Sequence, residues 1–312
     1  MPRLVPRRRK RKPFSTILLA GLPTAVSPRR GVVLDTEDNL DGTTFGGVNT
    51  TGSTAGTVFK LTPSGSFTTL VSFSGFNEIY PDAAYPLASV ILDSEGNFYG
   101  TTVAGGDYQY GAVYKITPSS GGTALYSFAN QDDGRSPQAG VVRDAAGSLY
   151  GTAQGGIHGS GVVFKLTPSG VFTALYSFCS VANCTDGAAN GTGPYGVVLD
   201  SKGNLYGTTY GGGAYNYGTV FKVTPTGKET VLHSFAPNGK DGFSPVAGVI
   251  LDSRDNIYGT TQLGGKIGVG TVFEVTATGT ETILHSFAGG TGGIFPEAGL
   301  IFDTKGNLYS TT

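Results

Sequence analysis

The feature that most constrains this chain is a repeat with a period of about fifty residues. Its clearest copy, at 200–209, reads Asp-x-x-Gly-Asn-Leu-Tyr-Gly-Thr-Thr. The leading aspartates of successive copies lie 51 to 58 residues apart, at Asp35, Asp93, Asp144, Asp200, Asp252 and Asp303. Tandem units of this length indicate repeated supersecondary structure, so the period determines the architecture before any single residue is considered.

Each repeat contains four short strand-like segments separated by turn residues. In the fourth repeat these segments are 196–199, 205–209, 218–224 and 230–235. Val, Thr, Tyr and Phe dominate the segments, while Asp, Gly, Asn and Pro occupy the turns between them. Four short strands per unit are typical of propeller blades. We therefore predict an all-β fold, a β-propeller of four-stranded antiparallel blades with five complete repeats plus a partial sixth.

The repeat boundaries follow from this pattern. We expect an N-terminal segment, 1–27, and a β-propeller repeat domain, 28–312. The repeats are 28–85, 86–136, 137–193, 194–244 and 245–295, with a partial sixth at 296–312. We predict that this partial repeat packs as an incomplete sixth blade or lies beside repeat one. The glycine after each motif tyrosine is predicted to let an adjacent blade or backbone approach closely.

The N-terminal segment is open to three interpretations. A basic run at 7–12 precedes a short apolar run at 14–22, the order found in secretory signal peptides. Residues 15–20 could instead be a decayed last strand of a preceding repeat, and the whole segment could be a disordered basic tail. No stretch reaches the roughly 20 apolar residues of a membrane-spanning helix. The formal net charge is −1, so no global field would attract nucleic acid, and we predict neither a nucleic-acid partner nor a membrane span.

The repeat also resembles a known family. The order is Gly-Asn-Leu-Tyr-Gly-Thr-Thr, then Gly-Gly, then Gly-Thr-Val-Phe-Lys-Leu-Thr-Pro, then a strand ending in Ser-Phe. Over nearly all of 28–312 this order resembles the GloVer repeats of bacterial "choice-of-anchor" surface proteins. The Asp-led turn is also similar to NHL-like β-propeller repeats. The resemblance implies a secreted or surface-attached bacterial protein and supplies no catalytic residues. Such proteins often carry a C-terminal anchor, so its absence here suggests a truncated sequence.

Candidate catalytic and metal-binding residues are few. His233 and His285 occupy a column that holds Val71, Tyr126 and Tyr176 in other repeats, which indicates packing, and His158 has no obvious partner. Calcium loops need several convergent oxygen ligands, and each repeat turn offers essentially one aspartate, so turn capping is the favoured role. We predict no catalytic residues, no metal and no cofactor.

The two cysteines lie close together in the chain. Cys179 and Cys184 flank four residues in the longest connection between repeats. In an exported protein we expect them to form a local disulfide, whereas in a reducing compartment they would stay as thiols.

The functional prediction concerns one face of the disc. The short turns are nearly constant between repeats, whereas the other connections vary in length and content. Variable loops on a rigid scaffold commonly carry binding sites. We predict ligand binding by Tyr108, Tyr110, Tyr215 and Tyr217, with a purely loop-packing role as the alternative. The leading hypothesis is a secreted or cell-surface binding scaffold, monomeric, for an extracellular glycan or protein. The alternatives are a propeller-type lyase or hydrolase and a structural surface spacer.

Overall fold

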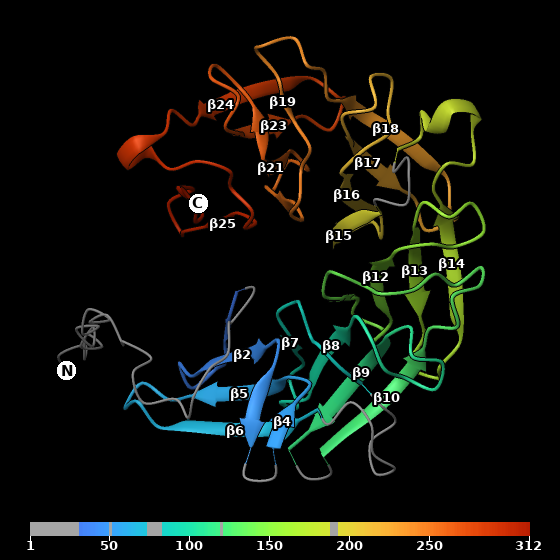
Figure 1. Cartoon of the computed structure of the whole chain (residues 1–312), viewed down its shortest axis with the longest axis vertical. Coiled ribbons are helices and arrows are strands. Elements are labelled where there is room, and N and C mark those ends of the chain that lie inside the picture. Colours follow the sequence, from blue (N-terminus) through green and yellow to red (C-terminus); the bar gives the residue numbers. More distant parts are fainter. Residues whose placement is uncertain (1–30, 50–51, 74–82, 119–120, 188–192) are drawn as a thin grey trace, which may run out of the picture.

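The computed structural model describes residues 31–49, 52–73, 83–118, 121–187 and 193–312, so the N-terminal segment 1–27 lies outside the described residues. The described residues form five four-stranded antiparallel sheets. The sheets follow one another around a central space, and the first blade and the last residues of the chain lie on the same side of the arc (Figure 1). The predicted all-β propeller is confirmed.

In every four-stranded sheet, chain order is spatial order, so consecutive strands pair. The first and second blades are β1 (Val33–Leu34), β2 (Leu40–Thr44), β5 (Thr57–Leu61) and β6 (Phe67–Ser72), then β7 (Ile91–Leu92), β8 (Phe98–Thr102), β9 (Ala112–Thr117) and β10 (Gly121–Ser127). The third and fourth blades are β11 (Val142–Arg143), β12 (Leu149–Ala153), β13 (Val162–Leu166) and β14 (Phe172–Ser177), then β15 (Pro194–Leu199), β16 (Leu205–Thr209), β17 (Thr219–Val223) and β18 (Glu229–Ser234). The fifth is β20 (Ile250–Leu251), β21 (Ile257–Thr261), β23 (Thr271–Val275) and β24 (Glu281–Ser286).

Several shorter elements lie outside the five four-stranded sheets. Two-stranded sheets pair β3 (Gly47–Asn49) with β4 (Gly52–Thr54) and β19 (Gly242–Phe243) with β22 (Leu263–Gly264). Short 3₁₀ turns are η1 (Ala182–Cys184) and η3 (Gly290–Gly292). No helix among the described residues is long and apolar enough to cross a bilayer.

The hydrophobic core lies between neighbouring blades, and the motif glycine is part of it. Phe221 on β17 is fully buried and packs against Phe178 of the third blade, with ring centroids 4.9 Å apart. Gly207 is the cross-strand partner of Phe221, and a Cβ on Gly207 would lie 2.6 Å from the Phe221 ring. The glycine therefore makes room chiefly for an aromatic ring of its own blade. An adjacent blade does not make the close approach that was expected, whereas a backbone does at Gly207, where the Gly196 carbonyl oxygen would lie 2.5 Å from such a Cβ.

The first threonine of the Gly-Thr-Thr motif joins each blade to the next. In four of the five blades its hydroxyl donates to a backbone carbonyl of the following repeat, from Thr43 to Ala88 at 2.9 Å and from Thr208 to Ala247 at 2.8 Å. Thr101 and Thr260 make the same contact with Ala139 and Ala298. In the third blade the Thr152 hydroxyl instead accepts from the backbone N–H of Gly196 at 3.1 Å. Because this threonine links each blade to the next, the same motif contributes to a strand within its own blade and to the contact with the following one.

The last residues form a two-stranded sheet beside the fifth blade. β25 (Ile301–Phe302) and β26 (Leu308–Tyr309) pair only with each other. Phe302 contacts Tyr258 of the fifth blade edge-on, with ring centroids 5.2 Å apart. A cavity of about 680 Å³ borders this sheet and is lined by Val32 before β1, by Ser89 and Gly248 of the second and fifth repeats, and by Thr311 and Thr312.

Candidate functional site

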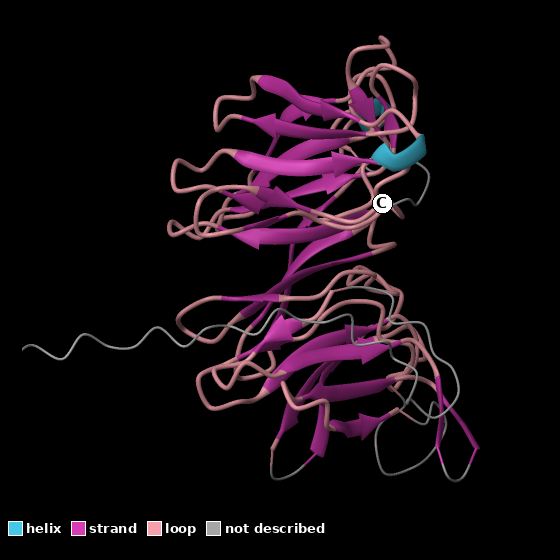
Figure 2. Cartoon of the chain, turned by 90° about the vertical axis from the view of Figure 1, so that its left-hand side faces the viewer, coloured by secondary structure: helices cyan, strands magenta, loops and turns pink. Residues whose placement is uncertain are grey.

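The connections between strands are divided between two faces of the disc. The antiparallel strand order places the turns within the first and second hairpins of each blade on one face, here called the short-turn face. The loops between the second and third strands, and those between blades, lie on the other, the long-loop face. Figure 2 shows short hairpin turns on its left side and longer loops with the 3₁₀ turns on its right.

On the short-turn face the repeated aspartate caps its own turn. In the fourth blade the Asp200 carboxylate accepts hydrogen bonds from the backbone N–H of Lys202 and Asn204, each at 2.8 Å, and from the Tyr206 hydroxyl at 3.2 Å. Burial opposes ionisation, but these bonds and the Asn204 side chain hold the pKa of Asp200 below its ordinary value. The carboxylate is satisfied within the turn, as a capping role requires.

On the long-loop face, the loop between the second and third strands has a fixed backbone. In blades two to five it spans seven residues, Gly-Gly-x-x-x-x-Gly, at 105–111, 155–161, 212–218 and 264–270. Its fifth residue takes a left-handed φ in each copy, including Gln109 at 66° and Asn216 at 62°. The prediction that these loops vary in length is wrong for blades two to five, where only side chains differ. The first blade departs from this by inserting β3 and β4.

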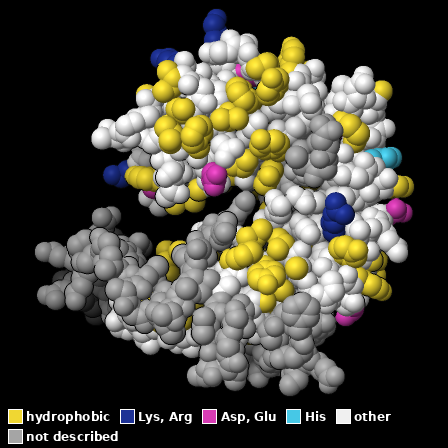
Figure 3. Space-filling view, viewed as in Figure 1, with side chains coloured by type: hydrophobic (Ala, Val, Ile, Leu, Met, Phe, Trp, Pro, Cys, Tyr) yellow, Lys and Arg dark blue, Asp and Glu magenta, His cyan; other side chains and the backbone are white. Residues whose placement is uncertain are grey.

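The four predicted tyrosines lie on two of these loops and remain accessible. Tyr108 and Tyr215, at equivalent positions, are each 58% exposed. Tyr110 and Tyr217 are less exposed, and Tyr217 packs on Phe243 with ring centroids 5.1 Å apart. Within the described chain no ring contact joins the two pairs, which are separated by the third blade. Figure 3, viewed onto this face, shows apolar side chains in separate patches over the blades.

The loops between blades carry a feature that the sequence analysis missed. Three of them, after the second, third and fourth blades, contain Asp-Gly, and the aspartate accepts a hydrogen bond from an aromatic or imidazole group on the outermost strand. Tyr126 donates to Asp133 at 2.9 Å, Tyr176 donates to Asp186 at 2.7 Å, and His233 lies 3.1 Å from Asp241. The recurrence of an Asp-Gly pair in three of these connections was the available signal.

Comparison with known proteins identifies the repeat. The family model described as the Gloeobacter/Verrucomicrobia repeat matches residues 12–190 and 179–312. The chain belongs to this family. No curated protein matches the sequence. The GloVer resemblance noted from the motif is thereby confirmed.

Solved structures similar to this Gloeobacter/Verrucomicrobia repeat protein share its fold at low identity. Virginiamycin B lyase from Staphylococcus aureus is 13% identical, with a TM-score of 0.54 over 90% of this chain and 83% of that one. The extracellular domain of a protein assigned as a one-component system, from B. thetaiotaomicron, is 14% identical, with a TM-score of 0.55 over 89% of this chain and 32% of that one. At such identities the likeness concerns the fold alone.

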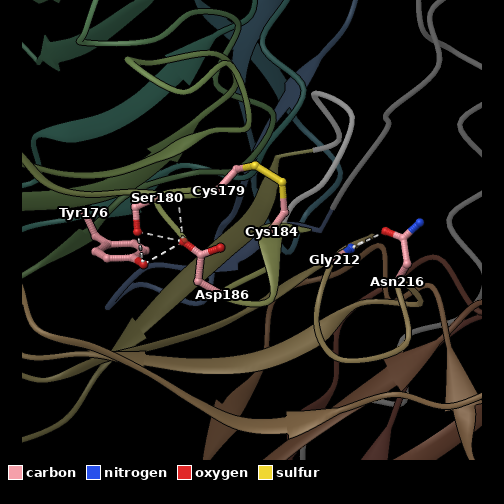
Figure 4. The surroundings of a disulfide bond; sticks show 7 residues. All are labelled: Tyr176, Cys179, Ser180, Cys184, Asp186, Gly212 and Asn216. Atoms are coloured by element: carbon pink, nitrogen blue, oxygen red, sulfur yellow. Dashed lines mark hydrogen bonds between the residues drawn. A yellow bond between two sulfur atoms is a disulfide. The ribbon is translucent and has the colours of Figure 1, made fainter. Parts of the chain in front are cut away.

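The cysteines of this repeat protein lie on the long-loop face. Cys179 and Cys184 are joined by a disulfide, with Cα atoms 4.1 Å apart, beside the Tyr176–Asp186 hydrogen bond (Figure 4). The Cys184 carbonyl accepts from the backbone N–H of Gly213 at 3.1 Å. The disulfide loop is therefore anchored to the loop that carries Tyr215.

Two half-buried glutamates on the outermost strands were also missed. Glu229 lies near Asp186 and Glu281 near Asp241, so each faces a carboxylate of the preceding blade. Burial, and then the neighbouring aspartate, raises the pKa of each glutamate to about 8. In the third blade the equivalent residue is Phe172, which stacks on Tyr126 at 4.3 Å. His158 is exposed in its loop, and His285 packs edge-on against Phe287.

Proposed function

We propose that this protein is a secreted or cell-surface binding scaffold whose ligand, an extracellular glycan or protein segment, contacts the long-loop face. The supporting observation is that Tyr108 and Tyr215 are both more than half exposed and come from loops of equal length and similar backbone angles. A tyrosine ring offers a large apolar surface with a polar tip and few rotatable bonds. Such rings suit stacking against sugars or clasping of an extended peptide.

The loops reduce the entropic cost of binding because they are already ordered. In the second blade, Gly111 N–H donates to the Gly105 carbonyl at 2.8 Å, and Ser136 N–H donates to the Tyr110 carbonyl at 2.7 Å. In the fourth blade, Gly218 and Ser244 donate in the same way to Gly212 and Tyr217, at 3.1 and 2.9 Å. A loop held in its bound conformation loses little freedom when a ligand arrives.

The tyrosines supply the direct test. Glycan and peptide arrays identify a ligand, whose affinity is then measured for wild type and for a variant with Tyr108, Tyr110, Tyr215 and Tyr217 changed to Ala. We expect at least a roughly tenfold loss of affinity, because aromatic anchors carry most of the energy of such contacts. Ile267→Ala, which removes an exposed side chain at the position equivalent to Tyr108, is the matched control and should bind normally.

An unchanged affinity in the folded four-tyrosine variant would contradict the proposal, as would a loss caused only by changes on the short-turn face. The same ligand is also incubated with wild-type protein and analysed for turnover. Chemical conversion of the ligand would favour the alternative, a propeller lyase or hydrolase.

We further infer that the protein acts as a monomer outside the cell, where the disulfide persists.

The disulfide gives a separate prediction. In protein exported to an oxidising compartment, we expect Cys179 and Cys184 to resist alkylation until a reductant is added. We expect the double change to Ser to lower unfolding free energy by roughly 1–3 kcal/mol, because the bridge closes only a short loop. Mass spectrometry after alkylation, with and without reductant, measures the bridge. Two freely alkylated thiols in the exported protein would contradict it.

A further inference from the structure

Equivalent contacts between the outermost strands of neighbouring blades occur three times along the outer rim of the propeller, each time with different side chains. Each such contact is here called a junction. In each junction, the first residue of an outermost strand meets the end of the preceding blade's outermost strand and its Asp-Gly loop. At the junction of blades two and three, Phe172 stacks on Tyr126. At the next junction, Glu229 faces Asp186, which is bonded to Tyr176. At the junction of blades four and five, Glu281 faces Asp241 and His233.

The last junction gathers three metal-binding groups. One ligand atom each of His233, Asp241 and Glu281 lies within 4.8 Å of the other two. Asp241 is only 5% exposed, and its second oxygen, Oδ1, has no hydrogen-bond donor; Oε1 of Glu281 is buried and likewise has none. Buried carboxyl oxygens that face one another are unfavourable unless a shared proton or a cation lies between them.

We propose that His233, Asp241 and Glu281 form a Zn²⁺ site that joins the fourth blade to the fifth. An imidazole nitrogen with two carboxylates is a ligand set that zinc accepts, whereas calcium prefers six to eight oxygen ligands. Three protein ligands leave the fourth tetrahedral position for water. The metal uses the donor-free oxygens of both carboxylates and compensates their charge.

The surroundings of His233 favour this role. Its ring packs edge-on against Phe235, with centroids 4.9 Å apart, which holds the imidazole in place beside Asp241. The His233 side chain is 19% exposed, so the ion can enter from solvent at the rim. Because Glu281 belongs to β24 while His233 and Asp241 come from the preceding blade, binding adds a cross-link to two blades that are already joined by packing, the Thr208 hydrogen bond and the Lys202–Asp255 ion pair.

The neighbouring junction provides the experimental control. The full-length chain is stripped with a chelator and titrated with Zn²⁺ by calorimetry, and with Co²⁺ to read the visible spectrum of the bound ion. We expect one equivalent of Zn²⁺ per chain and an increase in unfolding temperature on binding. His233→Tyr, which installs the residue native at position 176, and Glu281→Gln should each abolish stoichiometric binding. Glu229→Gln, the equivalent change one junction away, should leave it intact.

A double variant distinguishes loss of the metal site from a failure to fold. His233→Tyr with Glu281→Phe reproduces the Tyr126–Phe172 pair that the chain already accommodates at another junction. We expect this variant to fold and to show no Zn²⁺-dependent rise in unfolding temperature. The proposal is overturned if wild type takes up no stoichiometric Zn²⁺, or if the folded variants bind it as tightly as wild type does.

Discussion

Phe221→Ala is expected to lower the free energy of unfolding by about 3–5 kcal/mol, the usual cost of deleting a buried aromatic ring. Phe221 is fully buried between the third and fourth blades, where it contacts Phe178 and lies in one cluster with Leu205 and Val223. Gly207 has no side chain to fill the vacated space, and the paired strands on both sides restrict relaxation. The change therefore removes buried area and leaves a cavity.

Urea unfolding followed by circular dichroism measures this loss. Val171→Ala is the control, because Val171 is 58% exposed in a turn and its truncation should change stability by less than about 0.5 kcal/mol. A Phe221→Ala protein as stable as this control would show that the blade interface does not carry the stability assigned to it.

Raising the pH is expected to destabilise the protein through Glu229. The pKa of this carboxyl is 4.5 when unfolded and about 8 when folded, because of burial and then the charge of Asp186. The folded state therefore binds more protons between these values, and stability falls as pH rises through that window. The contribution is fully present below 4.5 and fully lost above about 8. Allowing for partial solvent screening, the loss is on the order of 1–2 kcal/mol.

The measurement compares wild type with Glu229→Gln across this pH window. Gln cannot ionise, so the variant should gain stability relative to wild type as pH rises, with little difference at acidic pH. Glu297→Gln, a change at an exposed position, is the control and should follow wild type throughout. A difference between wild type and Glu229→Gln that does not vary with pH would contradict the raised pKa. The repeat aspartates do not confuse the comparison, because both proteins contain them.

Local structure could be predicted well from the sequence because the repeat encodes it in contiguous residues. The segment predicted at 205–209 coincides with β16, and the outermost strand predicted at 230–235 differs from β18 by one residue at each end. The turn-capping role of Asp200 also follows from neighbours within six residues. The four tyrosines could be assigned to the long-loop face from strand order alone. Their separation into two distant pairs required the structure.

The sequence by itself determined the blade, its turns and the order of blades, because these depend on residues close in the chain and on a repeated pattern. Only the tertiary structure decided which side chains meet at the outer rim. Glu281 lies 40 residues from Asp241 and 48 from His233 in the chain, and their proximity depends on how one blade packs against the next. Position 281 would fit the strand pattern equally well as Phe, Gly or Glu. The pattern therefore does not predict which residue of the neighbouring blade it contacts.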